Sequence, residues 1–179
     1  MKFHELILIG LLFQFFDINF GAFDIIPDFI GFLIIVNAFS KVHAQYANLG
    51  MLCAALLSIT SIIGMAQPKL FAPSASLSLQ IFTILIGLLT ILYLACIFSV
   101  SKEILRGEES MFPTLFISAQ LIVQLFSSIG MHLDVNLYEN FVIATSVLLF
   151  GFYIYFIVFL WKRKNKENAL FNEEIVEES

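Results

Sequence analysis

The sequence predicts an all-α fold: a polytopic integral membrane protein built as a bundle of six transmembrane helices. Its 179 residues are 60% hydrophobic and 13% charged, and the mean hydropathy is +0.94. Soluble domains are about 45–50% apolar and about 25% charged. The apolar runs also reach about 20 residues, a length that crosses a hydrocarbon core of about 30 Å as a helix. The lipid bilayer is therefore the expected surrounding of most of the chain.

Six predicted spans are separated by charged residues, prolines and polar clusters. The third ends before Gln67 and Pro68, and the sixth ends on Trp161 and a basic cluster. Pro113 suits the first turn of the fifth, where its missing N–H has no intrahelical partner. We expect the first run to stay in the mature protein, because the bulky Phe20 stands where signal-peptide cleavage needs a small residue. The spans are about 5–23, 27–45, 49–66, 79–100, 113–131 and 140–161.

The basic residues predict the orientation. With the N-terminus inside, eight lysines and arginines lie on the cytoplasmic side and only Lys69 lies outside. Cytoplasmic loops of membrane proteins carry such an excess. We therefore expect both termini in the cytoplasm, a plasma-membrane location, one transmembrane domain over 1–163 and a polar, acidic tail over 164–179. The cytoplasmic basic residues are Lys2, Lys41, Lys102, Arg106, Lys162, Arg163, Lys164 and Lys166.

Asp17 is the most unusual residue of the predicted spans. Counted along a helix from Leu6 it lies about 16 Å deep, near the bilayer midplane. An ionised carboxylate there costs about 2.5–3.5 kcal/mol, so it should face protein or water rather than lipid. Amide side chains at similar depth in the first, second and fifth spans are candidate partners. The predicted midplane polar site comprises Asp17, Gln14, Asn37, Gln120 and Gln124.

Two functional hypotheses differ in what they require of Asp17. Transport or binding of a small solute or ion needs an ionisable or solvated group at the midplane. A non-catalytic membrane interaction protein, such as a regulatory, immunity or assembly subunit, needs the polar residues only as hydrogen-bonding contacts between helices. In a third arrangement the first helix ends at Phe16 and Asp17 lies in a shallow re-entrant turn. The sequence leaves these alternatives open.

Asp24 and Asp28 flank the start of the second predicted helix. Pro27 fits the first helical position, which places Asp28 in the first turn. Carboxylates near a helix N-terminus meet unsatisfied N–H groups and the positive end of the dipole, which is worth about 0.3–1 kcal/mol. We interpret both as outer-face carboxylates or helix-capping residues, with a cation or substrate site as the alternative.

Sequence motifs of known enzymes are absent. The chain has no H-E-x-x-H, G-x-S-x-G or G-x-x-x-x-G-K-[ST] pattern, and its three histidines are isolated. Cys53 and Cys96 lie in apolar runs without a C-x-x-C pair, as expected of small buried hydrophobes. Basic residues form no surface away from the membrane edge, which argues against nucleic-acid binding. We expect no catalytic residue, metal or cofactor; the expected partners are the bilayer and other membrane subunits.

The most distinctive local pattern runs from Asp17-Ile-Asn-Phe-Gly21 to Ile25-Ile-Pro-Asp-Phe-Ile-Gly-Phe32. It resembles a motif, D-I-N-x-G followed by I-P-D-F-I-G-[FY], near the N-terminus of uncharacterised small multi-pass membrane proteins of Gram-positive bacteria. The resemblance covers residues 17–32 and the layout of the spans. It implies a plasma-membrane location and a designed connection between the first two helices, and it brings no activity with it.

Overall fold

The computed structural model contains six helices and one short β-ribbon among the residues that it describes, which are 2–15, 19–20, 23–24, 28–66, 77–106, 111–130 and 135–177. The prediction of six helices is confirmed. The ribbon pairs Asn19 with Asp24 and Phe20 with Phe23 in antiparallel register. The elements are α1 (Phe3–Phe15), β1 (Asn19–Phe20), β2 (Phe23–Asp24), α2 (Asp28–Ser40), α3 (Ala47–Ala66), α4 (Leu77–Ile104), α5 (Phe112–Gly130) and α6 (Val135–Glu177).

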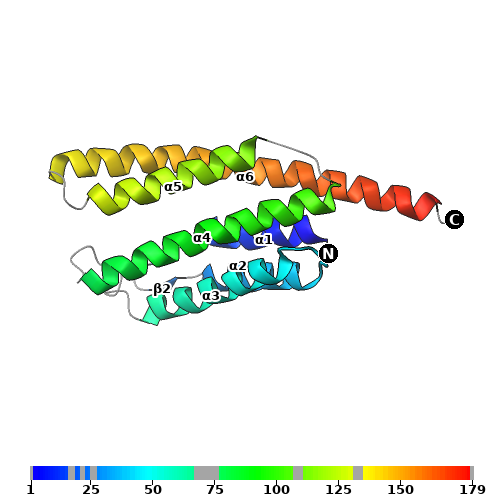
Figure 1. The fold of residues 1–179 in the computed structure, drawn as a ribbon, viewed down its shortest axis with the longest axis horizontal. Helices are drawn as coiled ribbons and strands as arrows, with labels where there is room; N and C mark the ends of the chain where they lie inside the picture. The colour runs from blue at the N-terminus through cyan, green and yellow to red at the C-terminus, as the bar shows by residue number, and fades with distance from the viewer. Residues whose placement is uncertain are drawn as a thin grey trace.

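The helices form an elongated bundle in which neighbours in sequence are neighbours in space. Each helix packs against the next along the chain, and contacts between α1 and α6 join the first helix to the last. Figure 1 shows α2 and α3 on one side of the bundle and α5 and α6 on the other, with α1 and α4 between them. Residues from α1, α4 and α6 can therefore meet in the interior.

Two of the described helices are long enough and apolar enough to cross a membrane. These segments are Ala47–Gly64 in α3 and Ile81–Ile104 in α4, with mean hydropathies of 1.8 and 2.7. Only 33% and 28% of their residues are buried inside the protein. Large apolar side chains on both helices are instead exposed, among them Leu52 and Leu85.

The first two helices are much shorter than the predicted spans 5–23 and 27–45. Each has 13 residues, a length of about 20 Å at 1.5 Å per residue. The second helix ends at Ser40, before the predicted boundary at residue 45. The first ends early because residues that follow it oppose a helix, although the hydropathy pattern continues. Asn19 and Gly21 have low helix propensity, and Phe20 and Phe23 favour strands. The helix end at Phe15 leaves Asp17 outside the described residues.

The last helix is longer than predicted. α6 runs unbroken over 43 residues and includes nearly all of the predicted tail, 164–179. This segment contains five glutamates and two lysines, which are good helix formers, so its polarity does not end the helix. Figure 1 shows the C-terminal part of α6 projecting beyond the other helices.

α1 and α2 approach each other backbone to backbone through two glycines. A Cβ placed on Gly31 would lie 2.5 Å from the carbonyl oxygen of Gly10 and 2.9 Å from Cγ of Gln14. On the other side of α2, Gly50 of α3 receives the ring of Phe39. Small residues at helix contacts allow such close packing. The first three helices therefore form one tightly packed unit.

Aromatic rings join the second half of the bundle. Phe98 of α4 and Phe116 of α5 both pack on Phe156 of α6, with ring centroids 5.1 and 4.9 Å apart. All three side chains are buried. Aromatic pairs of this kind add about 0.5–1.5 kcal/mol beyond the area they bury, so this cluster fixes α5 and α6 against α4.

We predict that Gly31→Ala lowers the free energy of unfolding by about 1–3 kcal/mol, because the added methyl forces the α1 and α2 backbones apart. Gly151→Ala is the matched control, since nothing lies within 4 Å of a Cβ at that position of α6. The control should be neutral or stabilising, because alanine favours a helix over glycine. Unfolding of both variants in detergent measures the difference; equal stabilities would contradict the close α1–α2 contact.

Candidate functional site

The structure describes only some residues of the predicted midplane site. Gln14 is half-buried near the end of α1, whereas Asn37 is exposed on α2. Gln120 is half-buried on α5, whose main neighbours are α4 and α6. Gln124 lies on the same helix, but its side chain, like all of Asp17, is outside the described part of the chain. The predicted contact among the first, second and fifth helices is therefore not seen in the described residues.

The two predicted capping carboxylates lie in different elements. Asp24 belongs to β2, opposite Asn19, and its side chain is outside the described residues. Asp28 begins α2, as the Pro27 pattern predicts. The residue is half-buried there, and its Oδ1 atom is inaccessible.

Asp28 and Gln14 belong to a group of polar side chains in the interior, which we call the polar core cluster. The Tyr93 hydroxyl of α4 lies beside the Gln14 amide, and the phenol of Tyr153 on α6 lies close enough to both Tyr93 and Asp28 to interact with them electrostatically. Phe32, one turn after Asp28, packs edge-on to the Tyr93 ring at 5.8 Å. The cluster thus joins four helices and comprises Gln14, Asp28, Tyr93 and Tyr153.

The Tyr93 hydroxyl and the Gln14 Nε2 atom of this cluster are buried without a hydrogen bond among the described residues. The Tyr93 side chain is 1% exposed. Although Tyr93 and Gln14 are neighbours, their geometry falls short of a hydrogen bond, and neither the Tyr93 hydroxyl nor Gln14 Nε2 has a partner among the described residues. A buried polar group left unsatisfied costs about 1–3 kcal/mol. Such groups are rare in folded proteins and often mark a binding site.

A second polar network ties three helices together at the end of the bundle where α1 begins. His4 Nε2 lies 2.7 Å from Oγ of Ser101, and Nδ1 lies 3.0 Å from Oε2 of Glu167. The backbone N–H of His4 also donates to that carboxylate, at 3.2 Å. Arg163 Nη1 donates to Ser101 Oγ at 3.2 Å. We call this group the His4 network; it connects the start of α1, the end of α4 and the middle of α6.

Ser101, His4 and Glu167 follow the order of a nucleophile, a base and an orienting acid in a catalytic triad. The burial of the network argues for a structural role, because the Ser101 and His4 side chains are both 0% exposed. The Ser101 oxygen is also held by Arg163. A substrate carbonyl has no access to this serine, so the contacts act as ties between helices. Among the described residues, no group of three or more His, Cys, Asp or Glu side chains could hold a metal ion.

Burial and hydrogen bonding act in opposite directions on Glu167. Burial favours the neutral acid and alone would raise the pKa of Glu167, but the hydrogen bonds and charge of His4 outweigh it and lower that pKa below its usual range. The carboxylate form is therefore the one that holds α1 to α6. Next to it, Nζ of Lys164 lies 3.7 Å from Oε1 of Glu5. This ion pair is partly exposed, so it adds little to the stability of the fold by itself.

Sequence reasoning missed Tyr93, Tyr153 and the His4 network, for two different reasons. Tyrosines inside apolar runs count as hydrophobic, so their hydroxyls do not interrupt a span. His4 and Glu167 are 163 positions apart in sequence, and local spacing carries no signal for that contact. Only Gln14 and Asp28 of the polar core cluster had been singled out.

Comparisons with protein-family models, with curated proteins and with solved structures find no match for this chain.

We predict that Glu167→Gln lowers the free energy of unfolding by about 1.5–3 kcal/mol near neutral pH, because it weakens hydrogen bonds to a charged acceptor. Since folding lowers the pKa of Glu167, its contribution is complete above the pKa of an unfolded glutamate, about 4.3, and is lost as the pH falls through the lower folded value. The variant should lose this part of the acid dependence in detergent unfolding measurements.

The matched control is Glu103→Gln, which removes an exposed carboxylate that accepts a hydrogen bond from the Gln45 backbone. It should keep the acid-dependent loss of stability. If Glu167→Gln and Glu103→Gln have the same pH profile, the carboxylate of Glu167 does not tie α1 to α6.

Proposed function

We propose that the chain is a multi-pass plasma-membrane protein whose polar core cluster binds a small cation for transport or sensing across the bilayer. Membrane location is supported by the outward-facing apolar surfaces of α3 and α4, in which only a third or less of each segment is buried. Soluble monomers rarely expose contiguous apolar patches of more than a few hundred Å². A bilayer provides the apolar surrounding that these side chains need.

The arrangement of charges supports a cytoplasmic location for both termini. Contacts between His4 and Ser101, between Glu5 and Lys164 and between Gln45 and Glu103 bring four chain segments to one end of the bundle. These segments carry all eight basic residues of the predicted cytoplasmic set. Positive charge concentrated at one end is the main determinant of membrane orientation. We assign this end to the cytoplasm.

The depth of the polar core cluster fits a site inside the bilayer. Along α1, Gln14 is about 15 Å from His4, and along α4, Tyr93 is about 12 Å from Ser101, at 1.5 Å per residue. A hydrocarbon core is about 30 Å thick, so both residues lie near its middle. Polar and ionisable groups at this depth usually face the protein interior and mark ion or solute pathways.

The donor set of the cluster favours a cation. Asp28 supplies a carboxylate, Gln14 an amide oxygen, and Tyr93 and Tyr153 two phenol oxygens, and oxygen ligands suit alkali and alkaline-earth ions. A bound cation would be coordinated by the Asp28 carboxylate and by the Tyr93 hydroxyl oxygen, which has no hydrogen bond among the described residues. The single observation that carries the proposal is the Tyr93 hydroxyl, which is buried beside the Gln14 amide without a hydrogen bond among the described residues.

The cation hypothesis predicts stabilisation by an ion that depends on Asp28. Purified protein in detergent is titrated separately with Na⁺, K⁺, Mg²⁺ and Ca²⁺ while its thermal unfolding is followed. A ligand at 100 times its Kd stabilises the folded state by about 2.7 kcal/mol. At least one cation should raise the Tm of the wild type, and Asp28→Asn and Tyr93→Phe should reduce the rise.

Gln120→Ala is the matched control, because this residue is polar, half-buried and outside the cluster; it should keep the full response. Asp17→Asn is measured in parallel, because Asp17 belongs to the midplane site predicted from the sequence. If no cation acts, or if Asp28→Asn responds like the wild type, the cluster only holds helices together. The chain is then better explained as a non-catalytic membrane interaction protein.

The proposed topology predicts which introduced cysteines react from outside the cell. Cysteines at Ser74 and Asn136 should react with an impermeant thiol reagent in intact cells, and one at Asn172 should react only after the membrane is permeabilised. The native cysteines, Cys53 and Cys96, are buried and give a low background. Labelling of position 172 in intact cells would reverse the orientation.

A further inference from the structure

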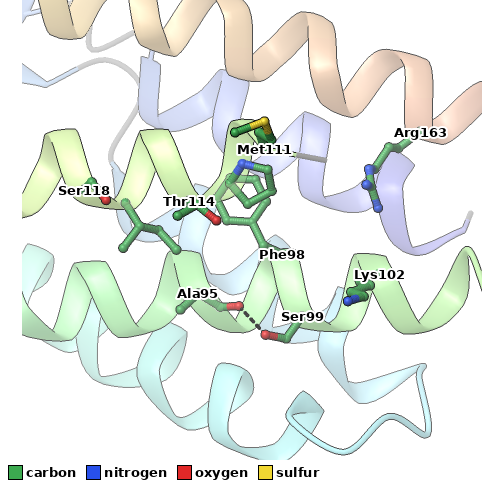
Figure 2. A pocket seen from close by; sticks show the side chains of 10 residues that line it. Ala95, Phe98, Ser99, Lys102, Met111, Thr114, Ser118 and Arg163 are labelled. Atoms are coloured by element: carbon green, nitrogen blue, oxygen red, sulfur yellow. Dashed lines mark hydrogen bonds between the residues drawn. The ribbon is translucent and has the colours of Figure 1, made fainter. Parts of the chain in front are cut away.

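A cavity outside the polar core cluster opens between α4, α5 and α6. Its volume is about 630 Å³, within the range of small-molecule sites. Figure 2 shows Lys102 and Arg163 at one end of the cavity and Ser118 at the other, with Phe98 and Thr114 between them. The cavity therefore has a cationic end and a mainly apolar body.

The cationic end is held in place by the fold. Arg163 is only 5% exposed, donates to Ser101 and lies over the Phe159 ring at 4.7 Å. Lys102 lies in the last turn of α4, and its side chain is exposed. Both residues belong to the basic end of the bundle, so this end of the cavity lies at the cytoplasmic side in the proposed topology.

The lining of the cavity is amphipathic. Met111 is 82% exposed, and Lys102, Thr114 and Ser118 are exposed as well. Phe98 is buried and Ile117 is half-buried, so the cavity also has an apolar wall. Such a lining suits an amphipathic ligand whose charged group reaches Lys102 and whose apolar part lies on Phe98 and Ile117.

We propose that this cavity binds an anionic phospholipid of the cytoplasmic leaflet. The phosphate group lies between Lys102 and Arg163, where charge-assisted hydrogen bonds form, and an acyl chain runs along Phe98 and Ile117. Basic pockets between transmembrane helices on the cytoplasmic side bind anionic headgroups in this way. The inference rests on the membrane location in the proposed function and is independent of cation binding at the polar core cluster.

The test measures lipid retained by the purified full-length protein. The protein is placed in nanodiscs containing equal amounts of dioleoyl-phosphatidylglycerol and dioleoyl-phosphatidylcholine, and bound lipid is counted by native mass spectrometry after release. Phosphatidylglycerol should be retained in preference. Lys102→Gln should weaken this preference about fivefold, the factor that one basic group contributes near an anionic membrane surface.

Two variants and one soluble anion complete the experiment. Lys102→Arg keeps the charge and should retain the preference, and Lys41→Gln removes an exposed lysine away from the cavity and should have no effect. Inorganic phosphate alone should not change thermal stability. Equal retention of both lipids, an unchanged Lys102→Gln variant, or stabilisation by phosphate alone would each overturn the lipid site. None of these outcomes depends on the cation titration.

Discussion

The close contact between Gly10 and Gly31 is the constraint on which the interior depends. It lets the α1 and α2 backbones touch, and it brings the Gln14 side chain against the first turns of α2. Asp28, the first residue of α2, is then directed toward the same interior as Tyr93 and Tyr153. A side chain at either glycine would push the α1 and α2 backbones apart. The polar interior is thus a consequence of having no side chain at two positions.

The second constraint is the closure of the bundle by the His4 network. Contacts between sequence neighbours alone would leave α6 attached only to α5. The Glu167 carboxylate and the Arg163 guanidinium instead bind α6 to α1 and α4, and the Phe156 ring packs on α4 from the same helix. Polar contacts at the end of the bundle and aromatic contacts in its middle therefore support the same arrangement.

The sequence was sufficient for the number of helices and for the positions of α3, α4 and α5, because long uninterrupted apolar runs determine them. It was not sufficient for the end of α1, where the preferences of Asn19 and Gly21 compete with a continuous hydropathy signal. For the candidate site it identified Gln14 and Asp28 but not the tyrosines near them. Which faces meet depends on packing at Gly10 and Gly31, and helical spacing alone does not contain that information.

The length of α6 places the cavity and the partner of the first helix on one element. A straight helix of 43 residues is about 65 Å long. Arg163 at the cavity and Glu167 at His4 are one turn apart on it. A shift of this turn would therefore change the cavity lining and the contact with His4 together.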